Sequence, residues 1–207
     1  MRYGPVARRL QRPRKVLAGA LSAGFALALT GCISFGPDAP DRLYTLTPSS
    51  VAPAGSASTG EASAGLAVLE PTAAQRLTVT RVPVMIDDAS LAYLADALWV
   101  ERPARLFQRL LAETIRARGN RLVLSDDDLQ YAAETKLSGQ LVEMGYHVPT
   151  QSAVVRYDAV LQLPDGNVLT RRFESTVPGL AAEASVVGPA LNQAANQVAA
   201  DVAEWIG

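Results

Sequence analysis

The segment AVVRYDAVLQLPDGNVLTRRFESTV, residues 153–177, has the clearest structural pattern in the sequence. Apolar and polar side chains alternate through residues 153–163 and again through residues 168–177, which is the two-residue period of a β-strand with one buried face. Between the two runs, residues 164–167 read Pro-Asp-Gly-Asn, a sequence rich in turn formers. The stretch therefore predicts an antiparallel β-hairpin whose apolar side faces a core.

Strand formers outside the hairpin predict the rest of a sheet. Residues 136–148 predict a long strand, in which Gly139 and Gly145 indicate bulges or close packing. Shorter strands are predicted at residues 43–47, at residues 76–84, near Trp99 and at residues 121–124. Pro83 suits the edge or the end of its strand, because proline has no N–H to donate to a ladder.

Two amphipathic helices are predicted to cover this sheet. The first begins at Pro103 and ends at Gly119-Asn120, with apolar residues at three-to-four spacing between them. The second spans residues 185–206, with Ser185 as N-cap and Pro189 in the first turn. A short helical piece is also expected over residues 125–132, where Ser125 precedes three aspartates.

Residues 49–75 are expected to form a flexible loop, because Ala, Ser, Gly, Pro and Thr dominate them. The fold class predicted from these elements is α/β. It is a single domain over residues 43–207, with a mixed sheet of about five or six strands packed by two main helices.

The N-terminal region has the form of a bacterial lipoprotein signal. Residues 1–15 carry six basic and no acidic side chains, and the apolar run of residues 16–29 is 14 residues long. A membrane-spanning helix needs roughly 20 apolar residues, so this run is too short for one. Leu29, Thr30 and Gly31 then stand as signal-peptidase recognition residues before Cys32. We therefore expect cleavage before Cys32, the only cysteine of the chain, with a lipid on its thiol.

Three parts of the chain follow from this signal: a signal peptide at 1–31, an acylated N-terminus and tether at 32–42, and the domain at 43–207. Two or more acyl chains, such as palmitate, anchor a protein stably, whereas one alone does not. Ile33 follows the cysteine, where enteric-type bacteria use Asp to retain lipoproteins in the inner membrane. We therefore expect lipid attachment at the periplasmic face of the outer membrane.

Composition argues against several classes of function. Removal of residues 1–31 leaves 13 basic against 20 acidic side chains, a net charge of about −7. Such a charge argues against nucleic acid as a partner. Once Cys32 is acylated, no thiol remains for a disulfide or a cysteine metal site. Hydrophobic residues make up 49% of the chain, which is ample for one core.

No motif of catalysis or cofactor binding stands out. His147 is the only histidine, and the chain contains no Gly-x-Ser-x-Gly element to accompany it. An ordinary strand histidine is therefore preferred to a catalytic one. Residues 126–128 are three aspartates whose spacing fits helix capping better than cation binding. We expect no catalytic residue, no cofactor and no metal.

Six arginines lie on the predicted exposed sides of the first helix and the hairpin: Arg102, Arg105, Arg109, Arg156, Arg171 and Arg172. We interpret them as a solvated face, with the docking of a partner as the alternative. Trp99 and Trp205 are expected in the core.

Three short motifs occur in a distinctive order behind the lipoprotein signal. They are Leu43-Tyr44-Thr45-Leu46, the run Trp99 to Pro103 followed by Leu106-Phe107-Gln-Arg-Leu-Leu, and residues 190–199 followed by Trp205. In this order the chain resembles the ABC-type transport auxiliary lipoproteins, including the lipoprotein component of MCE-type and paraquat-inducible phospholipid transport systems. Where many relatives have Pro-x-Tyr-Leu-Asp, this chain has Ala92-Tyr93-Leu94-Ala95.

The resemblance implies a non-catalytic accessory lipoprotein of the outer membrane. Its partners would be an MCE-domain protein and the inner-membrane ABC permease and ATPase, and its cargo would be phospholipid or another hydrophobic molecule. An edge strand and the hairpin face are the candidate docking surfaces, and a homo-oligomer is a further possible assembly. The alternatives are a periplasmic envelope hydrolase and a purely structural envelope lipoprotein.

Overall fold

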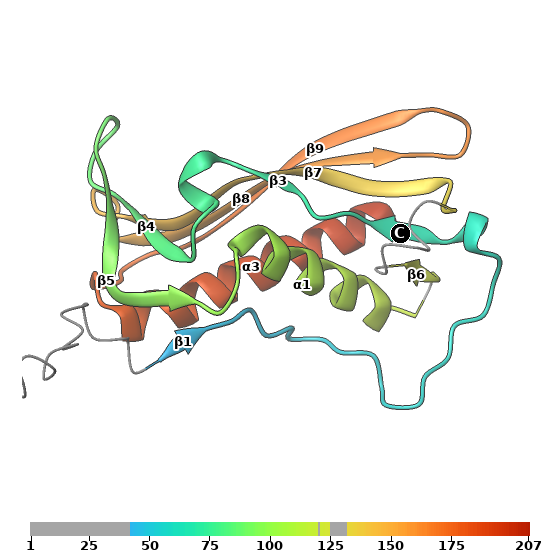
Figure 1. Ribbon diagram of the computed structural model, residues 1–207, viewed down its shortest axis with the longest axis horizontal. Helices are drawn as coiled ribbons and strands as arrows, with labels where there is room; N and C mark the ends of the chain where they lie inside the picture. The colour runs from blue at the N-terminus through green and yellow to red at the C-terminus, as the bar shows by residue number, and fades with distance from the viewer. Residues whose placement is uncertain (1–41, 120, 125–131) are drawn as a thin grey trace, which may run out of the picture. The chain divides into compact units, whose positions relative to one another are not determined.

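The computed structural model describes residues 42–119, 121–124 and 132–207 (Figure 1). Within these residues it has one nine-stranded mixed sheet and two α-helices, α1 and α3, so the predicted α/β class is confirmed. The helices are α1 (Pro103–Ala117) and α3 (Ala184–Ile206), with two 3-10 helices, η1 (Ala62–Ala64) and η2 (Gln75–Leu77). The strands are β1 (Leu43–Tyr44), β2 (Leu66–Val68), β3 (Thr72–Ala73), β4 (Arg81–Met85), β5 (Leu91–Trp99), β6 (Val123–Leu124), β7 (Thr135–His147), β8 (Ser152–Gln162) and β9 (Val168–Val177).

Strand β7 is the centre of the sheet. Along one side it pairs antiparallel with β8 over nearly its whole length. Along the other side it pairs parallel with β2, then β3, then β4, each over two or three residues. Strands β5 and β1 continue the sheet beyond β4, and β6 continues it beyond β2. One long strand thus pairs with several short strands and joins them into one sheet.

The predicted hairpin is present as β8 and β9, which pair antiparallel from Ala153 opposite Val177 to Gln162 opposite Val168. The Asp165 side chain closes the turn by accepting the N–H of Asn167 at 2.9 Å. Strand β9 pairs only with β8, so it is an edge of the sheet.

Helices α1 and α3 pack against each other on one face of the sheet (Figure 1). Phe107 of α1 meets Tyr157 of β8 edge to face, with ring centroids 5.1 Å apart. Trp205 of α3 contacts Phe173 of β9 at 5.6 Å. Trp99 is 2% exposed, so its predicted core position is confirmed, whereas Trp205 is only partly buried.

The expectation of a loop over residues 49–75 is wrong for residues 62–73. The structure places η1, β2 and β3 there, and Leu66, Ala67 and Val68 are completely buried. Strand β2 is stable because it pairs on both sides, with β6 and with β7. Three buried residues are too few to show a period, so the sequence did not predict β2 as a strand. For this reason the sheet has more strands than the five or six predicted.

Proline positions differ in two places from the prediction. Pro83 lies within β4, which sits between β5 and β7 and not at an edge. The proline is tolerated because the β4–β5 register shifts between Arg81 and Pro83 and pairing with β7 begins only at Val84. Pro189 lies inside α3, beyond its first turn, because the helix begins at Ala184.

The remaining helix predictions have mixed outcomes. Ser185 is not the N-cap of α3, because Glu183 holds that position without a side-chain cap. Helix α1 begins at Pro103 as predicted and ends at Ala117, and Gly119 follows with φ of 71°. The helical piece predicted over residues 125–132 falls almost entirely outside the described residues.

Gly139 and Gly145 mark close approaches to β7, which is one of the two alternatives, bulges or close packing, that glycines within a strand predicted. Gly139 has φ of 149°, and a Cβ there would collide with the carbonyl oxygen of Asp158. A Cβ on Gly145 would lie 2.6 Å from the carbonyl oxygen of Pro83. Both positions therefore depend on glycine for steric reasons.

Replacing Gly139 with alanine should lower the free energy of unfolding by about 2 kcal/mol, because a side chain there is strained by its backbone and by Asp158. Urea unfolding followed by tryptophan fluorescence measures this loss. The matched control is Gly60→Ala, where the nearest atom to a Cβ is 3.8 Å away. An equal loss in both variants would contradict the steric account.

Candidate functional site

The face of β7, β8 and β9 away from the helices carries a row of charged side chains. Because side chains alternate along a strand, the buried Tyr157 and Phe173 put Arg156, Asp158 and Arg172 on the opposite face. The registers align two lines across the three strands. We call them the charged rows: Glu143, Arg156 and Glu174 form the first, and Gln140, Asp158 and Arg172 form the second.

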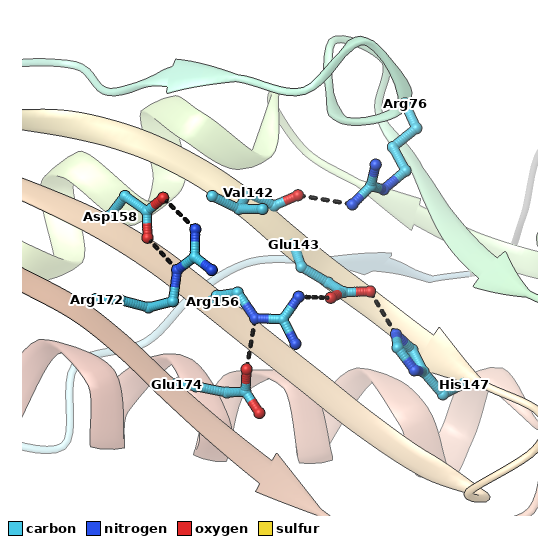
Figure 2. Close-up of polar contacts among 8 residues, drawn as sticks. All are labelled: Arg76, Val142, Glu143, His147, Arg156, Asp158, Arg172 and Glu174. Atoms are coloured by element: carbon cyan, nitrogen blue, oxygen red, sulfur yellow. Dashed lines mark hydrogen bonds and ion pairs between the residues drawn. The ribbon is translucent and has the colours of Figure 1, made fainter. Parts of the chain in front are cut away.

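A β-bulge brings Glu143 onto this face. The β7–β8 register shifts between Leu141 and Glu143, so both Leu141 and Met144 are buried although three positions separate them. The carbonyl of the intervening Val142 accepts a hydrogen bond from Arg76 Nη2 at 2.7 Å (Figure 2). Arg76 lies in η2, where the sequence predicted the start of a strand, so a residue far from β7 in the sequence contacts the bulge.

Glu143 is the most buried charge of the first row, with a side chain only 6% exposed. Its Oε2 accepts a hydrogen bond from Arg156 Nη1 at 2.8 Å, and its Oε1 contacts Nε2 of His147 (Figure 2). Arg156 also pairs with Glu174 through its Nε atom. A buried carboxylate is tolerated only when it is paired and hydrogen-bonded, and Arg156 meets this need from the neighbouring strand.

In the second row, Arg172 binds Asp158 with two parallel hydrogen bonds of 2.6 and 2.7 Å. The hydrogen bonds from Arg172, opposed by partial desolvation, hold the pKa of Asp158 below its ordinary value. The same pair raises the pKa of Arg172. The pairing therefore fixes both groups in their charged forms at neutral pH.

In this arrangement the charged groups are engaged with one another. His147 lies at the end of β7 with its Nε2 engaged by Glu143, as expected of an ordinary strand histidine that is exposed or hydrogen-bonded. Within the described ranges, no three His, Cys, Asp or Glu side chains are placed to hold a metal ion. Burial raises the pKa of Tyr157, whose hydroxyl donates to the Ser138 carbonyl at 2.7 Å.

The arginines of the first helix also behave as a solvated face. Arg105 and Arg109 have side chains 54% and 56% exposed, and both pair with Glu101. Arg102 pairs with Glu70 at 3.4 Å. Arg171 lies 5.1 Å from the ring centroid of Phe173, over its face.

A set of exposed aliphatic side chains lies at one end of the sheet, where β4 ends, β5 begins and the turn after β7 starts. We call Ile86, Leu91 and Val148 the sheet-end residues; they are 43%, 42% and 40% exposed. Backbone pairing holds them together, because Leu91 is opposite Met85 and Val148 donates its N–H to the Met85 carbonyl at 2.9 Å. The adjoining turn carries Asp87, whose pKa is lowered by a hydrogen bond from the N–H of Ala89.

Sequence reasoning missed the sheet-end residues, although a signal was present. Ile86 and Leu91 flank the Asp87-Asp88 turn, and a hairpin tip is where such apolar residues would be exposed. Residues 29–32, which carry the predicted lipid attachment, and the aspartates at 126–128 lie outside the described residues.

Two open hollows border the segment of residues 52–64. One, of about 520 Å³, lies among Glu61, Arg121 and Pro164. The other, of about 330 Å³, is lined by residues that include Pro53 and Arg116. Both mix charged and apolar groups, so neither has the lining expected of a lipid pocket.

A family model described as the ABC-type transport auxiliary lipoprotein component matches residues 44–203. The chain belongs to this family. The resemblance noted from the sequence motifs is thereby confirmed, and it covers nearly all of the described domain. The family description names a lipoprotein that is an auxiliary component of ABC-type transport.

Two solved structures share the fold of this auxiliary lipoprotein. A Xanthomonas campestris protein of the DUF330 family has a TM-score of 0.67 at 19% identity, over 80% of this chain and 94% of its own. A second, uncharacterised protein has a TM-score of 0.62 at 14% identity, over 80% and 97%. No curated protein matches the chain. Among the described residues, no helix has the length and apolar character to cross a membrane.

Arg156→Gln should destabilise the protein by about 3 kcal/mol, because it leaves the buried Glu143 carboxylate without its guanidinium partner. The matched control is Arg172→Gln. Its partner Asp158 is 35% exposed and can be rehydrated, so the loss should stay under about 1 kcal/mol. Urea unfolding at neutral pH measures both, and equal losses would contradict the difference in burial.

The Asp158–Arg172 pair should make stability pH-dependent. Because the folded-state pKa of Asp158 is lowered, its contribution is present above the unfolded value of about 3.9 and disappears as pH falls through the folded value. Asp158→Asn should therefore destabilise the protein at pH 7, and the difference from wild type should shrink towards pH 2. A constant difference across this range would contradict the assignment.

Proposed function

We propose that this protein is a non-catalytic accessory subunit of an MCE-type ABC transport system that moves phospholipid or another hydrophobic molecule across the envelope. The observation that carries the proposal is the family match over residues 44–203. The charged rows support a non-enzymatic role, because Glu143 and Arg156 are paired with each other and with neighbouring side chains. The proposed partners are an MCE-domain protein and the inner-membrane permease and ATPase.

The subunit is anchored at the periplasmic face of the outer membrane by acyl chains on Cys32. The sequence of residues 29–32 and the preceding apolar run support this placement. Ten residues, 33–42, separate Cys32 from the first strand in the sequence, which limits how far the domain can lie from the anchor. The anchor keeps the domain close to the membrane while its docking surface faces the transport complex.

The anchor is tested by labelling cells with radioactive palmitate. Wild type should take up label and sediment with outer-membrane fractions on a density gradient. Cys32→Ala should take up none and should lose this fractionation. Label retained in Cys32→Ala, or an inner-membrane position for wild type, would contradict the proposed attachment.

The docking contact is placed at the sheet-end residues rather than on the hairpin face. Arg156 and Arg172 of the hairpin already pair with Glu143, Glu174 and Asp158, so the charges of the hairpin face are balanced within the sheet. The sheet-end residues differ from the hairpin arginines, because they are exposed aliphatic side chains beside an acidic turn. An apolar contact with a basic rim on the MCE protein would complement them.

Leu91→Asp should abolish recovery of the MCE and ABC subunits when the acylated protein is isolated from detergent-solubilised membranes. A charge there would have to be buried without a partner in the complex. The matched control is Val51→Asp, which changes a residue 63% exposed in the segment before η1 and should leave recovery unchanged.

Circular dichroism should show that both variants stay folded. Failure of wild type to recover any MCE or ABC component would contradict the proposed function itself. Equal recovery by both variants would contradict only the docking surface.

A further inference from the structure

Strand β9 presents a long edge that no other described strand covers. Its ten residues pair with β8 on one side, and among the described strands it has no neighbour on the other (Figure 1). Most of its residues are exposed. An edge of this length is a template for pairing with another chain unless it is blocked.

The backbone groups available for such pairing can be identified from the turn. Leu163 donates its N–H to the carbonyl of Asn167 at 2.9 Å, which makes these two residues a hydrogen-bonded pair. Such pairs alternate along an antiparallel ladder, so every second residue of β9 directs its N–H and C=O away from β8. The residues with outward-directed backbone groups are Val168, Thr170, Arg172, Glu174 and Thr176.

The charges at these positions are complementary when two copies of β9 pair with each other. In an antiparallel pairing of two β9 strands about Phe173, Arg172 of one copy is opposite Glu174 of the other, and Thr170 is opposite Thr176. A pairing about Arg172 or Glu174 would instead place like charges opposite each other, which is unfavourable. On the helix side, pairing about Phe173 sets Leu169, which is 44% exposed, against Val177 and buries apolar surface.

The same register joins the two charged rows across the boundary. Glu143, Arg156 and Glu174 of one copy would continue directly into Arg172, Asp158 and Gln140 of the other. The signs then run negative, positive, negative, positive, negative before the neutral glutamine. Within one copy, Figure 2 shows both halves of this line already held in place by ion pairs.

From these observations we propose that β9 binds β9 of a second copy of this chain, antiparallel and centred on Phe173, to form one continuous sheet. The outward N–H and C=O groups of the two strands supply the hydrogen bonds, and the Arg172–Glu174 pairs fix the register. This pairing does not depend on the proposed transport function. The opposing interpretation is that Arg171 and Arg172 only protect the edge against association.

Cysteine cross-linking of the full-length protein in native membranes tests the pairing. Thr170→Cys combined with Thr176→Cys places two thiols opposite each other across the boundary, at the Cα separation of about 5.5 Å that a disulfide accepts. Mild oxidation should convert most of this double variant to a covalent dimer.

Each single variant should remain monomeric, because two cysteines at position 170 would lie about 20 Å apart. Wild type controls for Cys32. Thr170→Cys with Ser58→Cys controls for two exposed thiols without the proposed register.

A charge reversal then tests whether cross-linking depends on the proposed register or only on two copies lying near each other. Adding Glu174→Arg to the cross-linking variant sets like charges opposite Arg172 and should reduce the yield of dimer at least tenfold. Glu204→Arg changes the charge equally at an exposed site on α3 and should leave the yield unchanged. No dimer in the original double variant, or equal yields in the double variant and the Ser58 control, would overturn the proposal.

Discussion

The structure depends on the two-sided pairing of β7. Strands β2 and β3 are only three and two residues long, and strands that short have no independent stability; β4 and its neighbour β5 join β7 through two residues of β4. They are ordered because β7 and β8 form a long antiparallel ladder that already holds the register. The segment before α1 thereby becomes part of the sheet.

The bulge in β7 links this framework to the surface. By shifting the register after Leu141, it keeps Met144 in the core while directing Glu143 to the opposite face. The carboxylate is then matched by Arg156, and the freed Val142 carbonyl by Arg76. The result is a face of paired charges on a domain whose family is described as an auxiliary component of ABC-type transport. Within this account, the exposed edge of β9 and the sheet-end residues remain as surfaces for protein contacts.

The sequence predicted the elements that have a clear hydrophobic period within their own residues. Strands β8 and β9 alternate over ten or more residues, and α1 carries a clear apolar stripe, so their positions were predicted correctly. Strands β2 and β3 were missed because their order comes from pairing with a distant strand, which no local period records. The Glu143–Arg156 pair was missed for a related reason: the bulge that aligns the two residues depends on Arg76, far away in sequence. The lipid attachment at Cys32 rests on the sequence alone.

Amide hydrogen exchange of the purified protein tests the central role of β7 most directly. If the other strands depend on β7, its amides should exchange only through global unfolding, while those of β1 and the outer edge of β9 should exchange through smaller local openings. Exchange of the β7 amides at a lower free energy than those of β9 would contradict the account, because the sheet would then be organised around a different strand.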